Sequence, residues 1–317
     1  DMDVAPVTLP GSLPLGPLRS LQDLRTKARS LSTRIVAIAA AQDAVALEAA
    51  AVAEEEGLAR CVLVGDQHRI EAILWDLDRD PANFQIIDRQ EIHQAVETAV
   101  RLVREGHAHI LMKGKVTSSD LLKEVLHGER GLRTGQLLSD VFLFDSPLPG
   151  DPRLIGITDG GINLAPDLET KARILSNGLG LFRNLGYEKP KVAVLSAIEK
   201  VNSGLPSTVD AAELAKRAGS GAFGPCEVAG PLAMDLAVSA ESAKRKGVET
   251  PVAGAADLLL FPSIEAANIT AKAIQYMAGV EVGHVVLGAA APVLIPSRAE
   301  SVQAKTNGGA LGRLMVG

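Results

Sequence analysis

The chain has 317 residues, of which 47% are hydrophobic, 22% are charged and 3% are aromatic, and its formal net charge is −6. These values are close to those of an ordinary soluble globular protein, and the length suits two domains or one large one. The negative charge and the shortage of aromatic residues argue against a general nucleic-acid or anionic-lipid surface. An anionic substrate would therefore need local clusters of lysine and arginine.

The two cysteines, Cys61 and Cys226, are too few for a disulfide framework and lack metal-ligand spacing. No uninterrupted apolar stretch reaches the roughly 18 residues that a membrane span requires, and no signal peptide opens the chain. We therefore expect a cytoplasmic protein with free thiols. Residues 1–20 are rich in proline and are predicted to be a linker. They are either a frayed terminus or the point at which the chain was cut from a longer polypeptide.

Strands alternate with helices from Thr33 onward, which predicts βαβ units and a mainly parallel sheet. The first half of the chain is predicted to contain strands at 34–39, 61–66, 84–87 and 109–112 and helices at 43–57, 68–77, 91–104 and 117–126.

A segment dense in proline and turn-forming residues, 145–152, interrupts this alternation before it resumes. A helix is expected to begin with Pro166 in its first turn. The second half is further predicted to contain strands at 191–195 and 257–261 and helices at 208–217, 233–245 and 264–278.

The last apolar run, Val285–Ile295, is typical of a strand covered on both faces, and it leads directly into Pro296-Ser297-Arg298. Ligands of open α/β sheets bind just beyond the strand ends, and a guanidinium can hold phosphate through two parallel hydrogen bonds. Ser297 and Arg298 are therefore a candidate anion-binding pair. The alternative is a surface loop with a solvated arginine.

A second candidate site lies in the segment 112–120, between a predicted strand and a predicted helix. Lys113, Lys115, Thr117 and Ser118 surround a glycine there, and the free N–H groups of a helix N-terminus attract anions. The segment lacks the spacing of a Walker loop. Thr117 or Ser118 could equally well cap the helix, and both roles can hold together.

Two further loops contain polar residues in suggestive positions. Arg133 lies in the basic loop 130–135, for which a plain surface loop is the better interpretation. Asp159 and Asn163 lie in the segment 157–163, which is either a tight turn or the wall of a site.

Lys244-Arg245-Lys246-Gly247 is best interpreted as a helix C-terminus whose positive charges complement the helix dipole, with contact to an outlying phosphate of a large cofactor as the alternative. The six histidines show no spacing typical of metal ligands, so no metal site is expected.

Several segments occur in an order that resembles the phosphate acyltransferase family, which comprises phosphate acetyltransferases and phosphate butyryltransferases. These segments are 157–171, 230–238, 252–257, 261–268 and the Ser-Arg-Ala-Glu-Ser run at 297–301. The resemblance extends from about Thr33 to the end of the chain and looks closer to the butyryltransferase branch.

This resemblance implies exchange of a short acyl group between coenzyme A and inorganic phosphate, with coenzyme A as a substrate and no metal. It also implies two α/β domains with mainly parallel sheets, as in isocitrate and isopropylmalate dehydrogenases, and a site in the cleft between them. The first domain would comprise residues 21–147 and 288–317, and the inserted second domain residues 148–287. The implied assembly is a homodimer or a higher homo-oligomer, and some relatives carry a hydratase domain ahead of the transferase.

The resemblance also suggests roles for individual residues. Arg298 would bind phosphate, with Arg133 as a second candidate, and Ser297 would hydrogen-bond the reacting sulfur or the oxyanion. The family's acetyltransferases place an aspartate seven residues after the serine, where this chain has Ala304, so Glu300 is the substitute candidate for the base. The remaining residues expected at the site are Lys113, Lys115, Thr117, Ser118, Asp159 and Asn163.

The sequence leaves two other functions open. One is a metal- and NAD-dependent dehydrogenase of the related fold, for which the sequence supplies neither a clear metal site nor a clear nicotinamide site. The other is a catalytically idle coenzyme A-binding domain of a fusion protein, for which Ala304 is the best argument.

Overall fold

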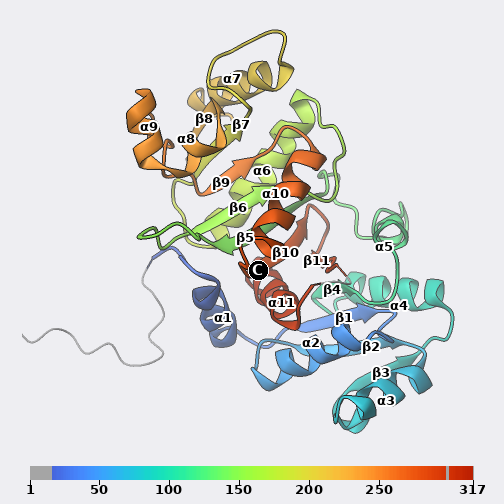
Figure 1. Cartoon of the computed structure of the whole chain (residues 1–317). Helices are drawn as coiled ribbons and strands as arrows, with labels where there is room; N and C mark the ends of the chain where they lie inside the picture. The colour runs from blue at the N-terminus through green and yellow to red at the C-terminus, as the bar shows by residue number, and fades with distance from the viewer. Residues whose placement is uncertain (1–15, 298–299, 317) are drawn as a thin grey trace, which may run out of the picture.

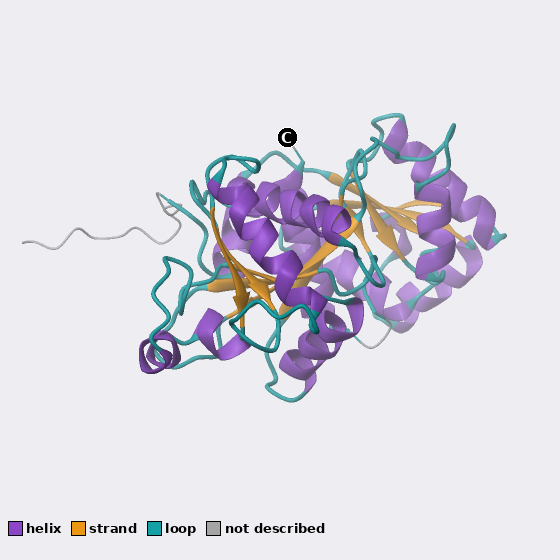
Figure 2. Cartoon of the chain, turned by 90° about the horizontal axis from the view of Figure 1, so that it is seen from above, coloured by secondary structure: helices purple, strands orange, loops and turns teal. Residues whose placement is uncertain are grey.

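The computed structural model describes residues 16–297 and 300–316, and within them the strands form one mixed sheet with helices on both faces (Figures 1 and 2). The order across the sheet is β3-β2-β1-β4-β11-β10-β5-β6-β9-β7-β8. The described strands are β1 (Ile35–Ala39), β2 (Arg60–Gly65), β3 (Gln85–Asp88), β4 (Ile110–Lys113), β5 (Ser139–Asp145), β6 (Leu154–Thr158), β7 (Lys191–Leu195), β8 (Glu227–Leu232), β9 (Leu258–Leu260), β10 (Val282–Leu287) and β11 (Val293–Leu294).

The predicted α/β class with a mainly parallel sheet is confirmed. Antiparallel pairing is confined to the middle of the sheet, where β10 pairs with β11 and β5, and β5 pairs with β6. The sheet is continuous across the predicted domain boundary, since β10 was assigned to the inserted domain and both of its neighbours to the first. The division into two domains stays a prediction.

Most helices begin where a side chain can accept a hydrogen bond from the first turn, as at Asp43, Asp66, Thr117 and Asp167. The described α-helices are α1 (Leu21–Ser30), α2 (Ala44–Glu55), α3 (Gln67–Asp76), α4 (Ile92–Arg104), α5 (Ser118–Val125), α6 (Leu168–Asn184), α7 (Pro206–Gly219), α8 (Met234–Val238), α9 (Ala240–Lys246), α10 (Ile264–Tyr276) and α11 (Val302–Met315), and a 3₁₀ turn spans Pro81–Asn83. Across this part of the chain, no helix combines the length and the apolar character needed to cross a membrane.

Two predicted elements are each divided in the structure. The run Val285–Ile295 forms β10 and β11, which are antiparallel, because the chain turns at Gly288. Gly288 has φ +100°, and a Cβ there would lie 2.1 Å from the carbonyl oxygen of Leu137, so only glycine fits. The predicted helix 233–245 is divided at Ser239, whose extended backbone ends α8 and whose hydroxyl caps α9.

Other boundaries also differ from the prediction. Pro166 lies outside α6, because Asp167 is the residue that caps this helix. The elements α1, β5, β8 and α11 were not predicted. The signal for α1 was present, since Ser20 caps the helix and Leu21, Leu24 and Ala28 then recur on one face.

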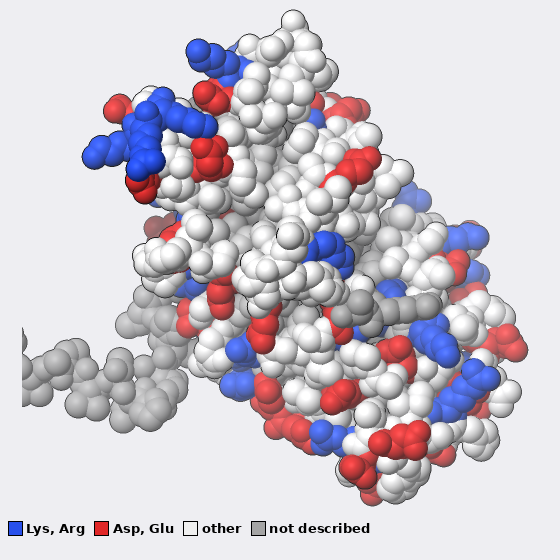
Figure 3. Space-filling view, viewed as in Figure 1, with Lys and Arg blue, Asp and Glu red and all other residues white. Residues whose placement is uncertain are grey.

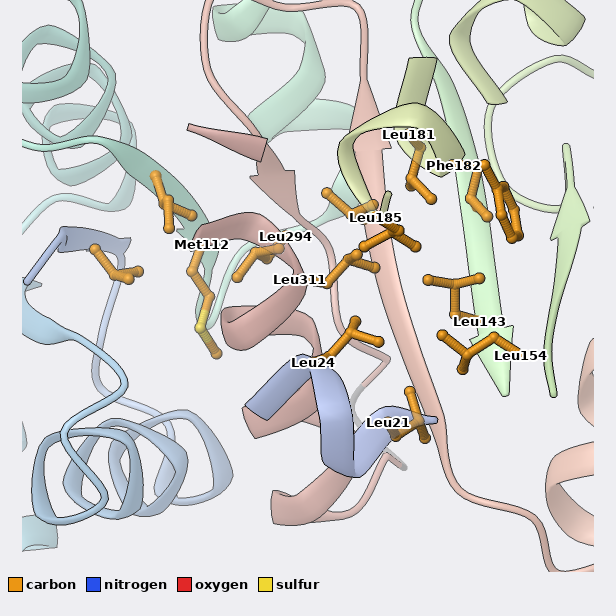
Figure 4. Close-up of a cluster of buried hydrophobic side chains, with 14 of the residues drawn as sticks. Leu21, Leu24, Met112, Leu143, Leu154, Leu181, Phe182, Leu185, Leu294 and Leu311 are labelled. Carbon is orange, nitrogen blue, oxygen red and sulfur yellow. The ribbon is translucent and has the colours of Figure 1, made fainter. Parts of the chain in front are cut away.

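A core cluster joins α1, α6 and α11 to the middle of the sheet. Figure 4 shows Leu24 of α1, Leu311 of α11 and Phe182 of α6 directed toward the strands. Of the predicted linker, residues 1–15 lie outside the described residues. Leu18 is buried, and its backbone N–H donates to the carbonyl of Leu185 at the end of α6 (2.9 Å). The burial of these apolar side chains stabilises the packing of the three helices against the sheet.

Candidate active site

A cavity of about 410 Å³ lies beyond the carboxyl ends of β4 and β11, bordered by α5 and α10. This is where an open α/β sheet usually binds its ligand. Of the described residues, its wall contains Lys113, Val116, Thr117, Ser118, Leu122, Asp140, Phe142, Gly160, Gly161, Ile162, Asn268, Lys272, His284, Ile295, Pro296, Ser297 and Glu300.

The loop between β4 and α5 supplies a positively charged side of the cavity. Lys113 is buried, and its Nζ donates to the carbonyl of Val116 (3.2 Å). Gly114 lets this loop pass close to the end of β1, because a Cβ there would lie 2.2 Å from the carbonyl oxygen of Ala40. Thr117 caps α5 by accepting a hydrogen bond from the N–H of Asp120 (3.1 Å). The capping interpretation is confirmed, and Thr117 and Ser118 at the N-terminus of α5 both line the cavity.

Ser297 and Glu300 reach the cavity from the segment between β11 and α11. The N–H of Glu300 donates to the carbonyl of Ser297 (3.1 Å), and the Nζ of Lys305, a buried residue of α11, donates to the same carbonyl (3.2 Å). Arg298, the predicted phosphate ligand, lies outside the described residues. Ala304 is buried in the hydrophobic core.

Asp159 forms the turn that the sequence suggested. Its carboxylate accepts the N–H groups of Gly161 (3.0 Å), Ile162 (2.9 Å) and Asn163 (3.1 Å). The tight-turn interpretation is confirmed, and this turn places Gly160, Gly161 and Ile162 in the cavity wall. That the segment forms the wall of a binding site stays a prediction. Asp159 itself is buried behind that wall. Burial, followed by the nearby charge of Asp140, raises the pKa of Asp159 to about 7.

Asn163, Lys115 and Arg133 do not line the cavity. The amide of Asn163 donates to the carboxylate of Asp159 and to the carbonyl of Leu138 (2.8 Å), so this residue fixes the turn from behind. Lys115 and Arg133 are exposed. The structure therefore brings Lys113, Thr117, Ser118, Ser297 and Glu300 together in the cavity wall. Asn163, Lys115 and Arg133 lie outside that wall.

Sequence reasoning missed Asp140 and His284, which form a pair in the cavity wall, with Asp140 completely buried and His284 partly buried. His284 of β10 lies opposite Phe142 of β5 in the sheet, and their rings stack with centroids 4.0 Å apart and planes 9° apart. The His284 Nε2 lies 2.9 Å from Oδ2 of Asp140. The sequence did contain a signal for both residues, because each is a titratable residue within a largely apolar strand.

The two partners of this pair influence each other's protonation. Burial works against the charged carboxylate of Asp140, but the hydrogen bond and the charge of His284 outweigh it and lower the pKa of Asp140. Burial likewise disfavours the imidazolium, but Asp140, then Glu300 and Asp159, raise the pKa of His284 above its ordinary value. The wall of the cavity thus contains a hydrogen-bonded pair in which each partner favours the charged form of the other.

The segment Lys244–Gly247 serves as a helix C-terminus, as predicted. Gly247 has φ +66°, and its N–H donates to the carbonyl of Lys244 (3.2 Å). Figure 3 shows basic side chains gathered over α9, and the Nζ of Lys246 pairs with Asp235 (2.9 Å). None of these basic residues lines the cavity.

Both cysteines are free thiols, Cys61 buried and Cys226 partly exposed. In the part of the chain that the structure describes, no group of three or more histidine, cysteine, aspartate or glutamate side chains is arranged to hold a metal ion.

Comparison with known proteins places the chain in one family. Residues 88–312 match the family model described as Phosphate acetyl/butaryl transferase. The phosphate butyryltransferase of Clostridium beijerinckii is 39% identical over 297 residues, which cover 94% of this chain and 98% of that protein. Among solved structures, a branched-chain phosphotransacylase from Enterococcus faecalis V583 has a TM-score of 0.79 and 28% identity, with 90% of this chain and 99% of that one covered.

A more distant structure shares the fold alone. The 4-hydroxythreonine-4-phosphate dehydrogenase of Klebsiella pneumoniae has a TM-score of 0.54 at 13% identity, with 90% of this chain and all of that one covered. This agrees with the predicted dehydrogenase-like architecture. The extent of the family match and the similarity to the clostridial protein lead to one conclusion: the chain belongs to the phosphate acetyl/butyryl transferase family.

Proposed function

We propose that this protein exchanges a short acyl group between coenzyme A and inorganic phosphate, and that the cavity beyond β4 and β11 is the reaction site. The observation that carries the proposal is the meeting of Lys113, the N-terminus of α5 and the segment containing Ser297 in one cavity. A lysine and free helix N–H groups suit a phosphoryl group. The aliphatic side chains in the same wall suit a short acyl chain.

In the direction of thioester formation, the sulfur of coenzyme A attacks the carbonyl carbon of the acyl phosphate. The thiol gives up its proton, the carbonyl oxygen becomes a transient oxyanion, and the bond from carbon to the phosphate oxygen breaks to release inorganic phosphate. The reverse direction forms that bond and returns a proton to the departing thiolate. The site must therefore hold phosphate, stabilise an oxyanion and transfer one proton.

Each requirement has a candidate residue. Arg298 is proposed to hold phosphate, together with Lys113, Thr117 and Ser118, which line the cavity. Arg133 is the second arginine candidate. Ser297 is proposed to hydrogen-bond the sulfur or the oxyanion, without an acyl-enzyme intermediate, and Glu300 is the proton acceptor that the sequence offers.

The test is thiol release from acetyl-, propionyl- and butyryl-coenzyme A in the presence of phosphate or arsenate. We expect release that depends on the added anion and on its concentration. An absence of anion-dependent release with all three thioesters would refute the proposal. Binding of coenzyme A without turnover would then favour the idle domain, and reduction of NAD by a hydroxy acid in the presence of a divalent metal would favour the dehydrogenase.

Three accompanying expectations belong to the same proposal. Coenzyme A acts as a substrate, the protein functions in the cytoplasm, and it assembles as a homodimer or a higher homo-oligomer. Light scattering coupled to size-exclusion chromatography measures the last of these directly.

A further inference from the structure

The nitrogen atoms of His284 are in two very different situations. Nε2 is paired with Asp140, whose side chain is completely buried. Nδ1 is also buried, but it has no hydrogen-bond partner among the described residues. A buried polar nitrogen without a partner costs free energy, so such atoms in folded proteins usually have a partner that the chain itself does not supply.

Asp140 is held in place by its own hydrogen bonds. Its Oδ1 accepts the N–H of Gly160 (2.7 Å), and its backbone carbonyl accepts the hydroxyl of Thr158 (2.6 Å). Because a carboxylate can only accept, Nε2 of His284 carries the hydrogen in this pair, and the lone pair of the neutral ring lies on Nδ1. The network thus selects one tautomer of His284.

The ring is also fixed in orientation. Phe142 stacks on one face of it, and the backbone of β10 is held between β5 and β11. His284 lines the same cavity as Ser297 and Lys113. An oriented imidazole with one nitrogen held by a carboxylate and the other unpaired is the arrangement used for proton transfer to a substrate.

We propose that His284 is the residue that carries the proton between the sulfur of coenzyme A and the site, and that Asp140 positions it. In thioester formation, Nδ1 accepts the thiol proton while sulfur attacks the acyl carbon and phosphate departs. In the reverse direction, the imidazolium returns that proton to the leaving thiolate. This inference rests on the proposed acyl exchange and assigns to His284 the proton transfer for which the sequence offered Glu300.

The charges around the ring support this role. Asp140 from β5, Asp159 after β6 and Glu300 after β11 all favour the imidazolium and raise the pKa of His284, against the opposing effect of burial. Among the described residues, the lysines closest to this part of the site are Lys113 of β4, Lys272 of α10 and Lys305 of α11. The first two line the cavity, and Lys305 is tied to the carbonyl of Ser297.

The decisive comparison is between His284→Gln and Glu300→Gln, assayed by anion-dependent thiol release from pH 5.5 to 9. Glutamine at 284 can still reach Asp140 but cannot take up a proton. We expect His284→Gln to lower kcat by about 10²–10⁴-fold, with the KM for acyl-coenzyme A changed only a few-fold, and to remove one ionisation from the kcat profile. Glu300→Gln should keep that ionisation. His68→Gln, at an exposed histidine, is the matched control and should behave like the unaltered protein.

A second variant separates proton transfer from support of the fold. In His284→Ala, added imidazoles should restore activity to an extent that follows the pKa of the imidazole used. Near-normal kcat in His284→Gln, or loss of the ionisation in Glu300→Gln alone, would overturn the inference and leave the acyl exchange intact. An unaltered protein without anion-dependent thiol release would instead refute the proposed function and the inference with it.

Discussion

A Cβ atom added at Gly161 would lie 2.3 Å from Oδ2 of Asp140, the oxygen that holds His284. Gly161→Ala is therefore expected to displace this carboxylate without removing any polar group from the site. Displacement of a positioning group by about 1 Å can cost on the order of 10²-fold in rate. We expect kcat for thiol release to fall at least about tenfold, while the circular dichroism spectrum stays unchanged.

The matched control for this prediction is Gly180→Ala in α6, because a Cβ there would meet nothing within 4 Å. It should retain full activity. Equal activity of the two variants would show that the position of Asp140 does not matter to the reaction.

The carboxyl group of Asp159 predicts a dependence of stability on pH. Its pKa in the folded protein is about 7, above the ordinary value of 3.8, so between these two pH values the folded state binds more protons than the unfolded state. The free energy of unfolding must then fall as the pH rises through this window, by at most about 1.4 kcal/mol per pH unit for one group. Asp159→Asn should show a shallower fall.

The measurement is urea unfolding at several pH values between 4.5 and 8. The raised pKa of His284 acts in the same direction, since its contribution to stability is lost as the pH rises through the folded-state pKa. The free energy of unfolding of Asp159→Asn should therefore still fall somewhat as the pH rises. Asp76→Asn, at an exposed aspartate, should leave the slope unchanged, and an identical slope in Asp159→Asn would contradict the prediction.

Arg313 of α11 is predicted to stabilise the fold. The residue is 1% exposed, and its guanidinium donates to the carbonyls of Gly57 (2.8 Å), Leu58 and Leu31. Arg313→Ala leaves these acceptors unsatisfied at about 1–3 kcal/mol each, so the free energy of unfolding should fall by about 3 kcal/mol or more.

Arg313→Lys should recover part of this loss, because an ammonium group cannot reproduce the planar fork of donors. The comparison is Arg29→Ala, which removes an exposed pair with Glu56 and should cost about 1 kcal/mol or less. Similar losses in urea unfolding for the two alanine variants would argue against this role of Arg313.

The aliphatic side of the cavity predicts which residues set the acyl-chain preference. Val116, Leu122, Ile162 and Ile295 belong to one hydrophobic cluster and all line the cavity. Leu122→Phe should lower kcat/KM for butyryl-coenzyme A relative to acetyl-coenzyme A by about tenfold, since one methylene group contributes about 1–3 kcal/mol of discrimination. Ile162→Ala should shift the preference toward longer chains.

The readout is kcat/KM across thioesters of two to six carbons. Ile198→Ala, at an exposed isoleucine, is the control and should leave the profile as it was. If Leu122→Phe and Ile162→Ala both preserve the profile, the acyl chain does not contact this wall.

The two arginines proposed from the sequence can be ranked by one experiment. Arg298→Ala should lower kcat/KM by several orders of magnitude through loss of the main phosphate ligand. Arg133→Ala should have a small effect, because Arg133 is exposed and does not line the cavity. The measurement is phosphate-dependent thiol release. A larger loss of kcat/KM in Arg133→Ala than in Arg298→Ala would indicate that the loop 130–135 binds the phosphate.

Hydrophobic periodicity and cap residues identified most strands and helices of the fold, because these signals are local. Examples are the predicted strand 34–39 for β1 and the predicted helix 91–104 for α4. The division between β10 and β11 depends on how close the chain passes to Leu137 at Gly288, a contact that no local pattern records.

The candidate site was predictable where functional residues lie in one short segment. Lys113, Thr117 and Ser118 follow one strand, and Ser297 and Glu300 follow another. Asp140 and His284 lie far apart in the sequence, and their pairing follows from the register between β5 and β10. That register depends on the folded sheet, so the most tightly anchored part of the site could not be derived from the sequence.

The position of β11 has a consequence for how the protein is made. Among the described strands, β11 comes last in sequence, yet it lies between β4 and β10 in the interior of the sheet. During synthesis, β4 emerges from the ribosome long before the partner that will cover its open edge. The nascent protein must therefore keep that edge unpaired until residues 293–294 have been synthesised, and the cavity can form only after that point.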